Sequence, residues 1–502
     1  MNQSTQQTTP RRRALIIVGI ALALVAGAIL ALAMADQPPP SNSPPSASQS
    51  PSPSPPGGSP PVDLATRLQG DVTVEGVTDH LEAFQRIADE NGGNRYTATP
   101  GHEASASYVA RVLRSAGYRV SFDRFDVTVY EENATAVLQR RAPSRISFEP
   151  SADFTTFNFS PSGSVTGRLT PVGVTETIDG LGGCDETAFS GFTTGDVALV
   201  QAGPCEFTDQ VLNAQNAGAS AALVMFTPQL SDTSVGVLRP TLASAEVEIP
   251  ALAVSTELGV ELARSGTRVH LEVDGDIAER TTRNVIAEQR GGTDDLLMVG
   301  AHLDSVADGP GINDNGSGSA SILELAVALA GVETGEGVRF AFWSAEELGL
   351  IGSDHYVSEL GDAERDRITA YLNFDMVASP NYMRLVYGDN LGNVDNPAAI
   401  KNLFLDYFDQ RDLDTDIIDL SGRSDHGPFE RAGIPVGGLF TGAEMIKDRE
   451  AARLFGGRAG RPADPCYHLA CDDIDNINGE SLDQLSDAIA FSVATLATSN
   501  EL

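Results

Sequence analysis

The stretch that decides the fold runs from residue 300 to residue 376. In order, it contains Gly300-Ala-His302-Leu-Asp304-Ser-Val, Gly311-Ile-Asn-Asp314-Asn-Gly-Ser-Gly-Ser, Ser344-Ala-Glu346-Glu347-Leu-Gly and Leu372-Asn-Phe-Asp375-Met. Three of these four clusters directly follow short apolar runs. In α/β proteins the carboxyl ends of strands carry side chains into one crevice. One His with several carboxylates and no nearby Cys favours a catalytic zinc site over a structural zinc finger.

Strands and helices alternate around this stretch. Apolar patterns predict strands over 118–130, 284–288, 296–300, 338–344 and 370–374, and helical periodicity predicts helices over 79–89, 103–116, 320–330, 400–408 and 482–496. This alternation predicts an α/β fold with a mostly parallel central sheet flanked by helices.

The pattern changes between residues 147 and 275, where short strands and many Gly and Thr residues surround one helix at 208–217. The α/β pattern resumes at Thr282. We therefore expect a small β-rich α+β domain over 147–275, inserted into a main domain made of residues 62–146 and 276–502.

The first 61 residues are expected to lie outside this fold. Arg11-Arg12-Arg13 precede an uncharged apolar run from Ala14 to Ala35, which is typical of a membrane-targeting segment. Its length suits a transmembrane anchor, whereas Ala33-Met-Ala35 has the form of a signal-peptide cleavage site. Residues 1–35 are therefore a signal peptide or an anchor, and the Pro/Ser-rich residues 36–61 are an extended linker. Both alternatives predict a secreted chain or one anchored to the outer face of the membrane.

The composition bounds the partners. The 502 residues carry a net charge of −36. Such a chain should be repelled by nucleic acid and by anionic membrane surfaces, so a solvated acidic surface is the expected role of the charge. We expect a monomer with no nucleic-acid partner.

Four cysteines in an exported chain predict disulfides. Three pairings are open. The positions favour the local one, in which Cys184 pairs with Cys205 and Cys466 pairs with Cys471.

The residue types suggest individual roles in the site. His302 is a zinc ligand through one ring nitrogen, and Asp304 can accept the other N–H. Asp314, in a glycine-rich turn, can bridge two metals. Of the adjacent acids Glu346 and Glu347, one can bind zinc while the other takes a proton from water. Each motif alone also fits a structural hydrogen-bonded pair, a helix cap or solvated acids.

A further carboxylate and a distant histidine complete the ligand set. Asp375 ends an apolar strand. The distant ligand is His426 or His468, and we choose His468 because the Cys466–Cys471 loop would hold it rigidly beside Tyr467. The other four internal histidines have no companion ligands and are expected to be structural: His80, His102, His270 and His355.

Six motifs, in order, resemble those of the secreted bacterial two-zinc aminopeptidases of clan MH, the leucyl aminopeptidase or aminopeptidase Y-like family. They are His302-Leu-Asp, Gly-Ile-Asn-Asp314-Asn-Gly-Ser-Gly, Glu346-Glu347-Leu-Gly, Asn-Phe-Asp375-Met, Gly-Arg423-Ser-Asp-His and Cys-Tyr-His468. The resemblance covers about residues 284–496. The inserted segment resembles a protease-associated (PA) domain.

The resemblance implies a role for each matching residue. His302, Asp314 and Asp375 would hold one zinc, and Asp314, Glu347 and His468 the other. Residues implied around the ions are Glu346 as general base, Asp304 behind His302, Tyr467 as oxyanion donor, Arg423 as substrate-orienting residue, and Met376 and Phe440 in the pocket for an apolar N-terminal side chain. A cis Asp314–Asn315 peptide bond is also implied. Family members carry a structural calcium whose matching acids here are Asp483 and Asp487; the amino-terminal half of that site has no recognisable counterpart.

These expectations define a zinc metalloaminopeptidase that hydrolyses the N-terminal peptide bond of peptides and proteins through a metal-bound hydroxide. The alternative is a carboxypeptidase or dipeptidase on the same two-zinc core. A binding module on an enzyme-like scaffold and a one-zinc glutaminyl cyclase are weaker alternatives, because the full two-metal ligand set is present.

Overall fold

The computed structural model describes residues 63–174, 182–226, 237–242, 246–264, 266–390 and 396–498. The predicted targeting segment and linker lie outside these residues. Within them, no helix combines the length and the apolar character needed to cross a membrane.

The helices and strands of the described residues have the following bounds. The helices are α1 (Leu64–Asp71), α2 (Val74–Glu90), α3 (Pro100–Ser115), α4 (Phe207–Asn216), α5 (Thr256–Leu262), α6 (Gly318–Leu329), α7 (Ile351–Ser358), α8 (Asp362–Arg365), α9 (Ala399–Asp409), α10 (His426–Arg431), α11 (Arg449–Phe455) and α12 (Gly479–Thr498). The strands are β1 (Arg119–Ala142), β2 (Ile146–Ser147), β3 (Phe154–Thr156), β4 (Gly163–Val172), β5 (Val197–Gln201), β6 (Ala221–Met225), β7 (Ala251–Val254), β8 (Arg268–Gln289), β9 (Leu296–His302), β10 (Gly337–Trp343), β11 (Ile368–Phe374), β12 (Leu385–Tyr387), β13 (Asp416–Ile418) and β14 (Val436–Phe440).

The central strands form the predicted mostly parallel sheet. β9 pairs in parallel with β10 on one side and with β11 on the other, and β11 pairs in parallel with β14. At one end β8 joins β10 in antiparallel register, and at the other β12 joins β14 in the same sense. The carboxyl ends of β9, β10 and β11 therefore meet at one edge of the sheet, which is where the sequence motifs begin.

Both faces of this sheet are buried, which explains the continuous apolar runs in its strands. Along β9, Leu297 and Val299 pack into the core shared with helices α2, α3, α6, α9 and α12, whereas Met298 packs on the opposite face with Phe429 of α10. Alternate strand residues thus contribute to two cores. The α/β prediction is confirmed.

Local sequence signals explain where the covering helices begin. Thr73 caps α2 by accepting the N–H of Gly76, and Thr99 caps α3 by accepting that of His102. Pro100 follows Thr99 in the first helical turn, where the missing N–H costs nothing. The boundaries expected from periodicity were several residues too short at these ends, because caps extend a helix beyond its apolar face.

The inserted segment continues the sheet through β4, which pairs antiparallel with β8, and it has hydrophobic cores of its own. β4, β5, β6 and β7 pair in parallel, with α4 packed on one face and α5 on the other. The predicted helix at 208–217 corresponds to α4.

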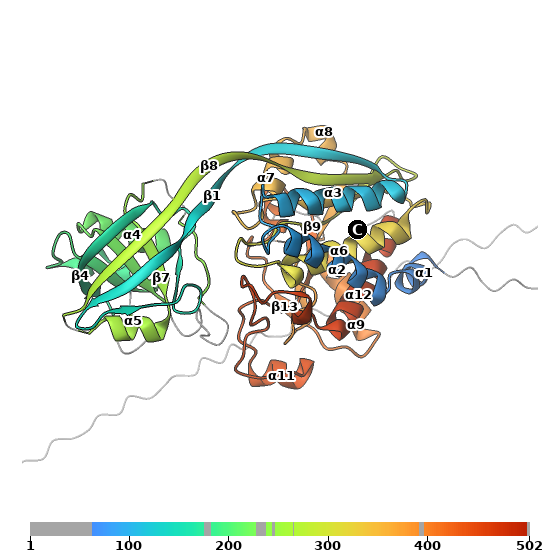
Figure 1. The fold of residues 1–502 in the computed structure, drawn as a ribbon. Coiled ribbons are helices and arrows are strands. Elements are labelled where there is room, and N and C mark those ends of the chain that lie inside the picture. The colour runs from blue at the N-terminus through green and yellow to red at the C-terminus, as the bar shows by residue number, and fades with distance from the viewer. Residues whose placement is uncertain are drawn as a thin grey trace, which may run out of the picture. The chain divides into compact units, whose positions relative to one another are not determined.

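Two long strands connect the inserted segment to the main sheet. β1 and β8 pair antiparallel from Arg119–Glu288 to Ala142–Arg268 and run side by side in Figure 1. The expected boundary at residues 275 and 276 falls inside β8. The alternating pattern of β1 was seen only as far as residue 130 because the strand becomes exposed there.

Candidate metal centre

Five candidate ligands, His302, Asp314, Glu347, Asp375 and His468, come from five separate places in the fold. His302 ends β9, Glu346 and Glu347 follow β10, and Asp375 follows β11. Asp314 lies in the turn η3 (Ile312–Ser317) that leads into α6. His468 comes from the loop closed by a disulfide between Cys466 and Cys471. The structure brings all five together.

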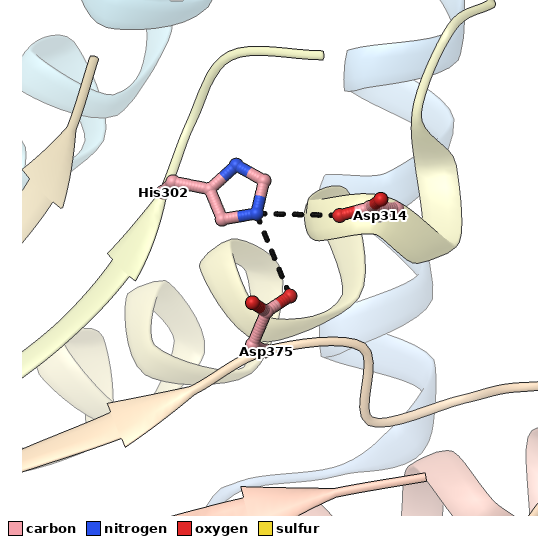
Figure 2. Close-up of side chains that lie close together, drawn as sticks. All are labelled: His302, Asp314 and Asp375. Atoms are coloured by element: carbon pink, nitrogen blue, oxygen red, sulfur yellow. Dashed lines mark ion pairs between the residues drawn. The ribbon is translucent and has the colours of Figure 1, made fainter. Parts of the chain in front are cut away.

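The first ligand group surrounds His302. Its Nε2 atom lies 3.2 Å from Oδ1 of Asp314 and 3.5 Å from Oδ1 of Asp375. Figure 2 shows the imidazole facing both carboxylates, one from the turn before α6 and the other from the end of β11. A donor atom from each of the three residues lies within 4.8 Å of the others, which is close enough for one ion.

The second group surrounds His468. Its Nε2 atom lies 3.0 Å from Oε2 of Glu347 and 3.2 Å from Oδ2 of Asp314. Asp314 therefore turns one carboxylate oxygen toward each histidine. A carboxylate placed in this way can bridge two cations.

The donor set fits zinc. His nitrogen and carboxylate oxygen are common zinc ligands, and catalytic sites leave a position for water or substrate. Oε1 of Glu347 and Oδ1 of Asp375 are buried and make no hydrogen bond. Buried charged oxygens without donors are costly, and a bound cation would remove that cost. The residues present therefore fit a pair of zinc ions.

The electrostatics of the histidines agree with this fit. Burial acts to lower the pKa of His302, but the charges of Glu346 and Asp375 outweigh it and raise the pKa well above its usual range. Burial also opposes protonation of His468, whose pKa is raised by Glu347 and Asp314. Both shifts have the same cause, a surplus of carboxylate charge around the imidazoles, and a bound cation would neutralise that charge.

Glu346 faces the same centre, and with His302 and Glu347 it forms a third group whose donor atoms lie within 4.8 Å of one another. Burial, followed by the charges of Glu347 and Asp425, raises its pKa well above the usual range, against the opposing charge of His302. Oε2 lies 3.9 Å from Nε2 of His302. A carboxylate with a raised pKa beside a metal site is suited to accepting and returning a proton.

Asp304 holds the site in a way that differs in detail from the expectation. Nδ1 of His302 lies 3.1 Å from the carbonyl oxygen of Asp304, whereas the nearer carboxylate oxygen is 3.8 Å away. That carboxylate instead accepts a hydrogen bond from Thr97 at 2.9 Å and the backbone N–H groups of Glu346 and Glu347 at 3.3 and 3.4 Å. Asp304 thus links the histidine to the two glutamates.

Three residues at the site have left-handed backbone conformations that non-glycine residues rarely adopt. They are Ala345 (φ 61°), Met376 (φ 50°) and His468 (φ 59°). Each is a ligand or lies next to a candidate site residue. Such conformations cost roughly 1–3 kcal/mol each and persist where the surrounding structure enforces them. The Asp314–Asn315 peptide bond is cis, as the resemblance implied.

The candidate substrate residues line one pocket with the ligands. Met376, Phe440, Arg423 and Tyr467 all border it. The Tyr467 ring stacks on that of His468, with centroids 3.8 Å apart.

His426, the rejected alternative to His468, also lines this pocket but belongs to no ligand group among the described residues. Its Nε2 atom accepts the backbone N–H of Gly422 at 3.3 Å.

Both disulfides have the favoured local pairing, Cys184 with Cys205 and Cys466 with Cys471, so that prediction is confirmed. The four histidines expected to be structural take part in none of the ligand groups found in the described residues.

Arg95 is a site residue that the sequence reasoning missed. It is fully buried, and its guanidinium donates to the carbonyls of Leu303, Pro310 (2.9 Å) and Gly311 (2.5 Å). Burial lowers its pKa to about 10, opposed by nearby carboxylates that include Asp304. The buried guanidinium thus joins the segment after β9 to the segment before η3. Its positive charge offsets part of the negative charge of the ligand carboxylates. No pattern in Asn94-Arg95-Tyr96 marks this role.

Asp472 and Ser424 were also missed. The Asp472 carboxylate accepts the backbone N–H groups of Asn313 and Asp314, each at 2.9 Å, and so fixes the turn that carries the bridging carboxylate. Ser424 donates to Oδ2 of Asp375 at 2.7 Å. Asp472 directly follows Cys471, so its nearness to the His468 loop was the available signal.

The acids matched to calcium lie on α12. Burial and the charge of Asp483 raise the pKa of Asp487 to about 6, and Arg411 acts in the opposite direction. No third metal-ligand residue joins them in the ligand groups of the described chain.

The chain is similar to known peptidases. Residues 284–493 match the model described as peptidase family M28, and residues 165–262 match that of the PA domain. The chain is 42% identical over 440 residues to an aminopeptidase of Pseudomonas aeruginosa (strain UCBPP-PA14), covering 85% of this chain and 81% of the relative. It is 38% identical to probable leucine aminopeptidase 2 of Aspergillus fumigatus, covering 84% and 82% of the two chains.

Another relative and a solved structure agree. The probable lipoprotein aminopeptidase LpqL of Mycobacterium tuberculosis is 35% identical, with 87% of each chain covered. An aminopeptidase from Aneurinibacillus sp. strain AM-1 has a TM-score of 0.68 at 25% identity, covering 87% of this chain and 97% of that chain. The chain therefore belongs to peptidase family M28, and the prediction of a metalloaminopeptidase with an inserted PA domain is confirmed at the level of the family.

Proposed function

We propose that this M28 metalloaminopeptidase binds two zinc ions and removes apolar residues from the N-termini of peptides and proteins. The observation that carries the proposal is the bridging position of Asp314, with one oxygen toward His302 and the other toward His468. Two adjoining ligand groups that share one carboxylate are what a two-metal hydrolase needs.

The ligand assignment follows the two groups. His302, Asp314 and Asp375 would hold one ion, and Asp314, Glu347 and His468 the other. When bound, zinc supplies Lewis-acid polarisation of the scissile carbonyl and makes a water acidic enough to attack at neutral pH.

The chain's own residues handle the proton and the developing charge. Glu346 accepts the proton of the attacking water and returns it to the leaving amine, for which its raised pKa is suited. Tyr467, beside His468, donates a hydrogen bond from its hydroxyl group to the developing oxyanion and keeps its proton. The surrounding carboxylates attract the free α-amino group of the substrate.

An apolar wall supports the preference for apolar N-terminal residues. Met376, Phe440, Ile418, Leu420 and Met445 line the pocket next to the ligands. A buried aliphatic side chain would gain about 1.5–3 kcal/mol by leaving water for such a wall.

The proposed location is outside the cytoplasm. Two disulfides are typical of oxidising compartments, and the apolar residues 14–35 follow three arginines. Whether this segment is cleaved or retained decides between a secreted and an anchored enzyme; mass spectrometry of the mature N-terminus separates the two.

A calcium ion at Asp483 and Asp487 is the least supported part of the proposal, because only two acids contribute. Calorimetric titration with Ca²⁺ after zinc loading tests it, with the Asp487→Asn variant as the control. Equal heats from both proteins remove calcium from the proposal.

The experiment for the main proposal measures zinc content and hydrolysis of leucine p-nitroanilide by the purified chain, with and without a chelator. About two zinc ions per chain and chelator-sensitive release are expected. N-blocked and C-amidated peptides then separate an aminopeptidase from a carboxypeptidase on the same core. An aminopeptidase cleaves the amide and rejects the blocked peptide, whereas the opposite result establishes the alternative.

A further inference from the structure

The outer end of the candidate substrate pocket carries an ion pair that the ligand assignment does not use. Arg423 and Glu444 both line the pocket, and Nη1 of Arg423 lies 3.1 Å from Oε1 of Glu444. The side chain of Arg423 is 68% exposed and that of Glu444 is 31% exposed. The guanidinium is therefore accessible to substrate, but a carboxylate of the protein already contacts it.

The charges around this pair are mostly negative. Among the described residues that line the pocket, Arg423 is the only arginine or lysine, whereas Asp419 adds an exposed carboxylate to that of the part-exposed Glu444. The charge of Glu444 is the largest influence that raises the pKa of Arg423, and Glu346 acts in the same direction. Glu444 and Arg423 also influence Tyr467, so the pair lies near the candidate reaction centre.

The ion pair lies where it can contact the part of a peptide that follows the scissile bond. In a dipeptide the free carboxylate follows the scissile bond by one residue, so it lies close to the reacting centre. A guanidinium is the preferred partner for such a carboxylate because its planar N–H groups match two oxygens. Here an incoming carboxylate would have to share Arg423 with Glu444 and would be repelled by it.

We propose that Glu444 is a specificity-determining residue that occupies Arg423 and selects against substrates with a free carboxylate one residue beyond the scissile bond. Dipeptides are then poor substrates compared with longer or amidated peptides. This inference rests on the proposed aminopeptidase function and names its substrate class.

The exposure of the pair makes the idea testable without damage to the fold. An exposed ion pair contributes about 0–1 kcal/mol to stability, so Glu444→Gln should leave the chain folded. The amide keeps the shape of the side chain and removes only its charge.

The experiment compares kcat/KM for Leu-Ala and Leu-Ala-amide with the zinc-loaded wild type and the Glu444→Gln variant. The wild type should favour the amide. In the variant, kcat/KM for Leu-Ala should rise about 3- to 10-fold, the effect of one screened charge contact, while that for the amide changes less than about twofold. Glu90→Gln, an equal change of net charge at an exposed end of α2, should change neither value.

Two further measurements identify the partner of the carboxylate. Adding Arg423→Gln to the Glu444→Gln variant should abolish the gain for Leu-Ala. About 1 M NaCl should reduce the difference between wild type and variant, because the Debye length falls to about 3 Å. An equal gain for both substrates, or no gain, overturns the role of Glu444. If the wild type cleaves neither peptide, the proposed aminopeptidase function itself fails.

Discussion

Two clusters of buried carboxylates adjoin each other at residues 313 and 314, and they are stabilised in different ways. In the amide-bound cluster, Asp464 and Asp472 accept hydrogen bonds from the Asn476 amide at 3.0–3.1 Å, and Asp464 accepts another from Asn313 at 2.6 Å. In the ligand cluster, one oxygen of each of two carboxylates, Oε1 of Glu347 and Oδ1 of Asp375, accepts none.

The difference separates structural acids from metal-binding acids. Burial and the charge of Asp464 raise the pKa of Asp472 well above its usual range, and amide and backbone N–H groups donate to both carboxylates. The ligand cluster instead faces two histidine nitrogens and has oxygens left over. Acids that are buried and also short of donors need a cation, which is the physical argument for the metals.

Removing a metal ligand from the ligand cluster should have the largest effect on zinc content and activity. We expect His302→Ala to bind about one zinc fewer per chain and to lose activity roughly 10⁴-fold or more, since the ion and its polarising charge are lost. Zinc analysis and leucine p-nitroanilide hydrolysis measure both quantities. His355→Ala, a part-exposed histidine on α7 that pairs with Asp123, is the matched control and should keep both. Full zinc and activity in His302→Ala would exclude it as a ligand.

The next largest effect is expected for Glu346, which faces the metal centre but is not assigned as a ligand of either zinc ion. Glu346→Gln should retain its zinc and lose about 10³-fold in kcat, because an amide cannot accept the proton of water. The exposed Glu359→Gln variant should match the wild type. A fall in zinc content together with activity would instead assign Glu346 to the ligand set.

The amide-bound cluster should act on the metals only through the backbone. The two carboxylate oxygens of Asp472 accept the backbone N–H groups of Asn313 and Asp314. Asp472→Asn replaces one of these oxygens by an NH₂ group, which cannot accept a hydrogen bond, so the turn that holds Asp314 is disturbed. We expect a loss of about 10- to 100-fold in zinc affinity, as for other residues that orient ligands. Competition with a chelator measures this loss. The exposed Asp475→Asn is the control, and equal affinities in the two variants would separate the clusters functionally.

The sequence could predict the site residues that stand in local patterns but not those defined by contacts between distant parts of the chain. The ligands stand at the ends of apolar strands or in a glycine-rich turn, so periodicity and residue type locate most of them, and the resemblance assigns their roles. Arg95 and Asp472 were missed because their partners lie about 160–220 residues away along the chain, and the only local signal was the position of Asp472 directly after Cys471.

The fold shows a similar limit. Strands β9, β10 and β11 were predicted because nearly every position is buried, whereas β12, β13 and β14 were not predicted and β1 and β8 become exposed along part of their length. β1 and β8 pair from the main sheet into the inserted segment, and this pairing joins residues far apart in the sequence, so local patterns do not predict it. Likewise, the choice of the Asp304 carbonyl over its carboxylate as the partner of His302 depends on backbone geometry that spacing does not specify.

The smallest effect concerns a buried base that stays neutral beside the ligand cluster. Burial lowers the pKa of His426 to about 4, and its Nδ1 atom is buried without a hydrogen-bond partner. In the unfolded chain an ordinary histidine has a pKa near 6.5, so between these values the unfolded state binds more protons. The free energy of unfolding should therefore decrease as pH falls from 6.5 toward 4.

This contribution amounts to about 1 kcal/mol between pH 6.5 and 5.5. Urea unfolding at both values, at fixed zinc concentration, measures it. In His426→Gln the decrease should be smaller by that amount, because the amide does not titrate. Release of zinc on acidification affects both proteins alike and cancels in the difference. An identical pH dependence in wild type and variant would mean that His426 does not contribute to it, and the assignment of His426 as a buried neutral base would fail.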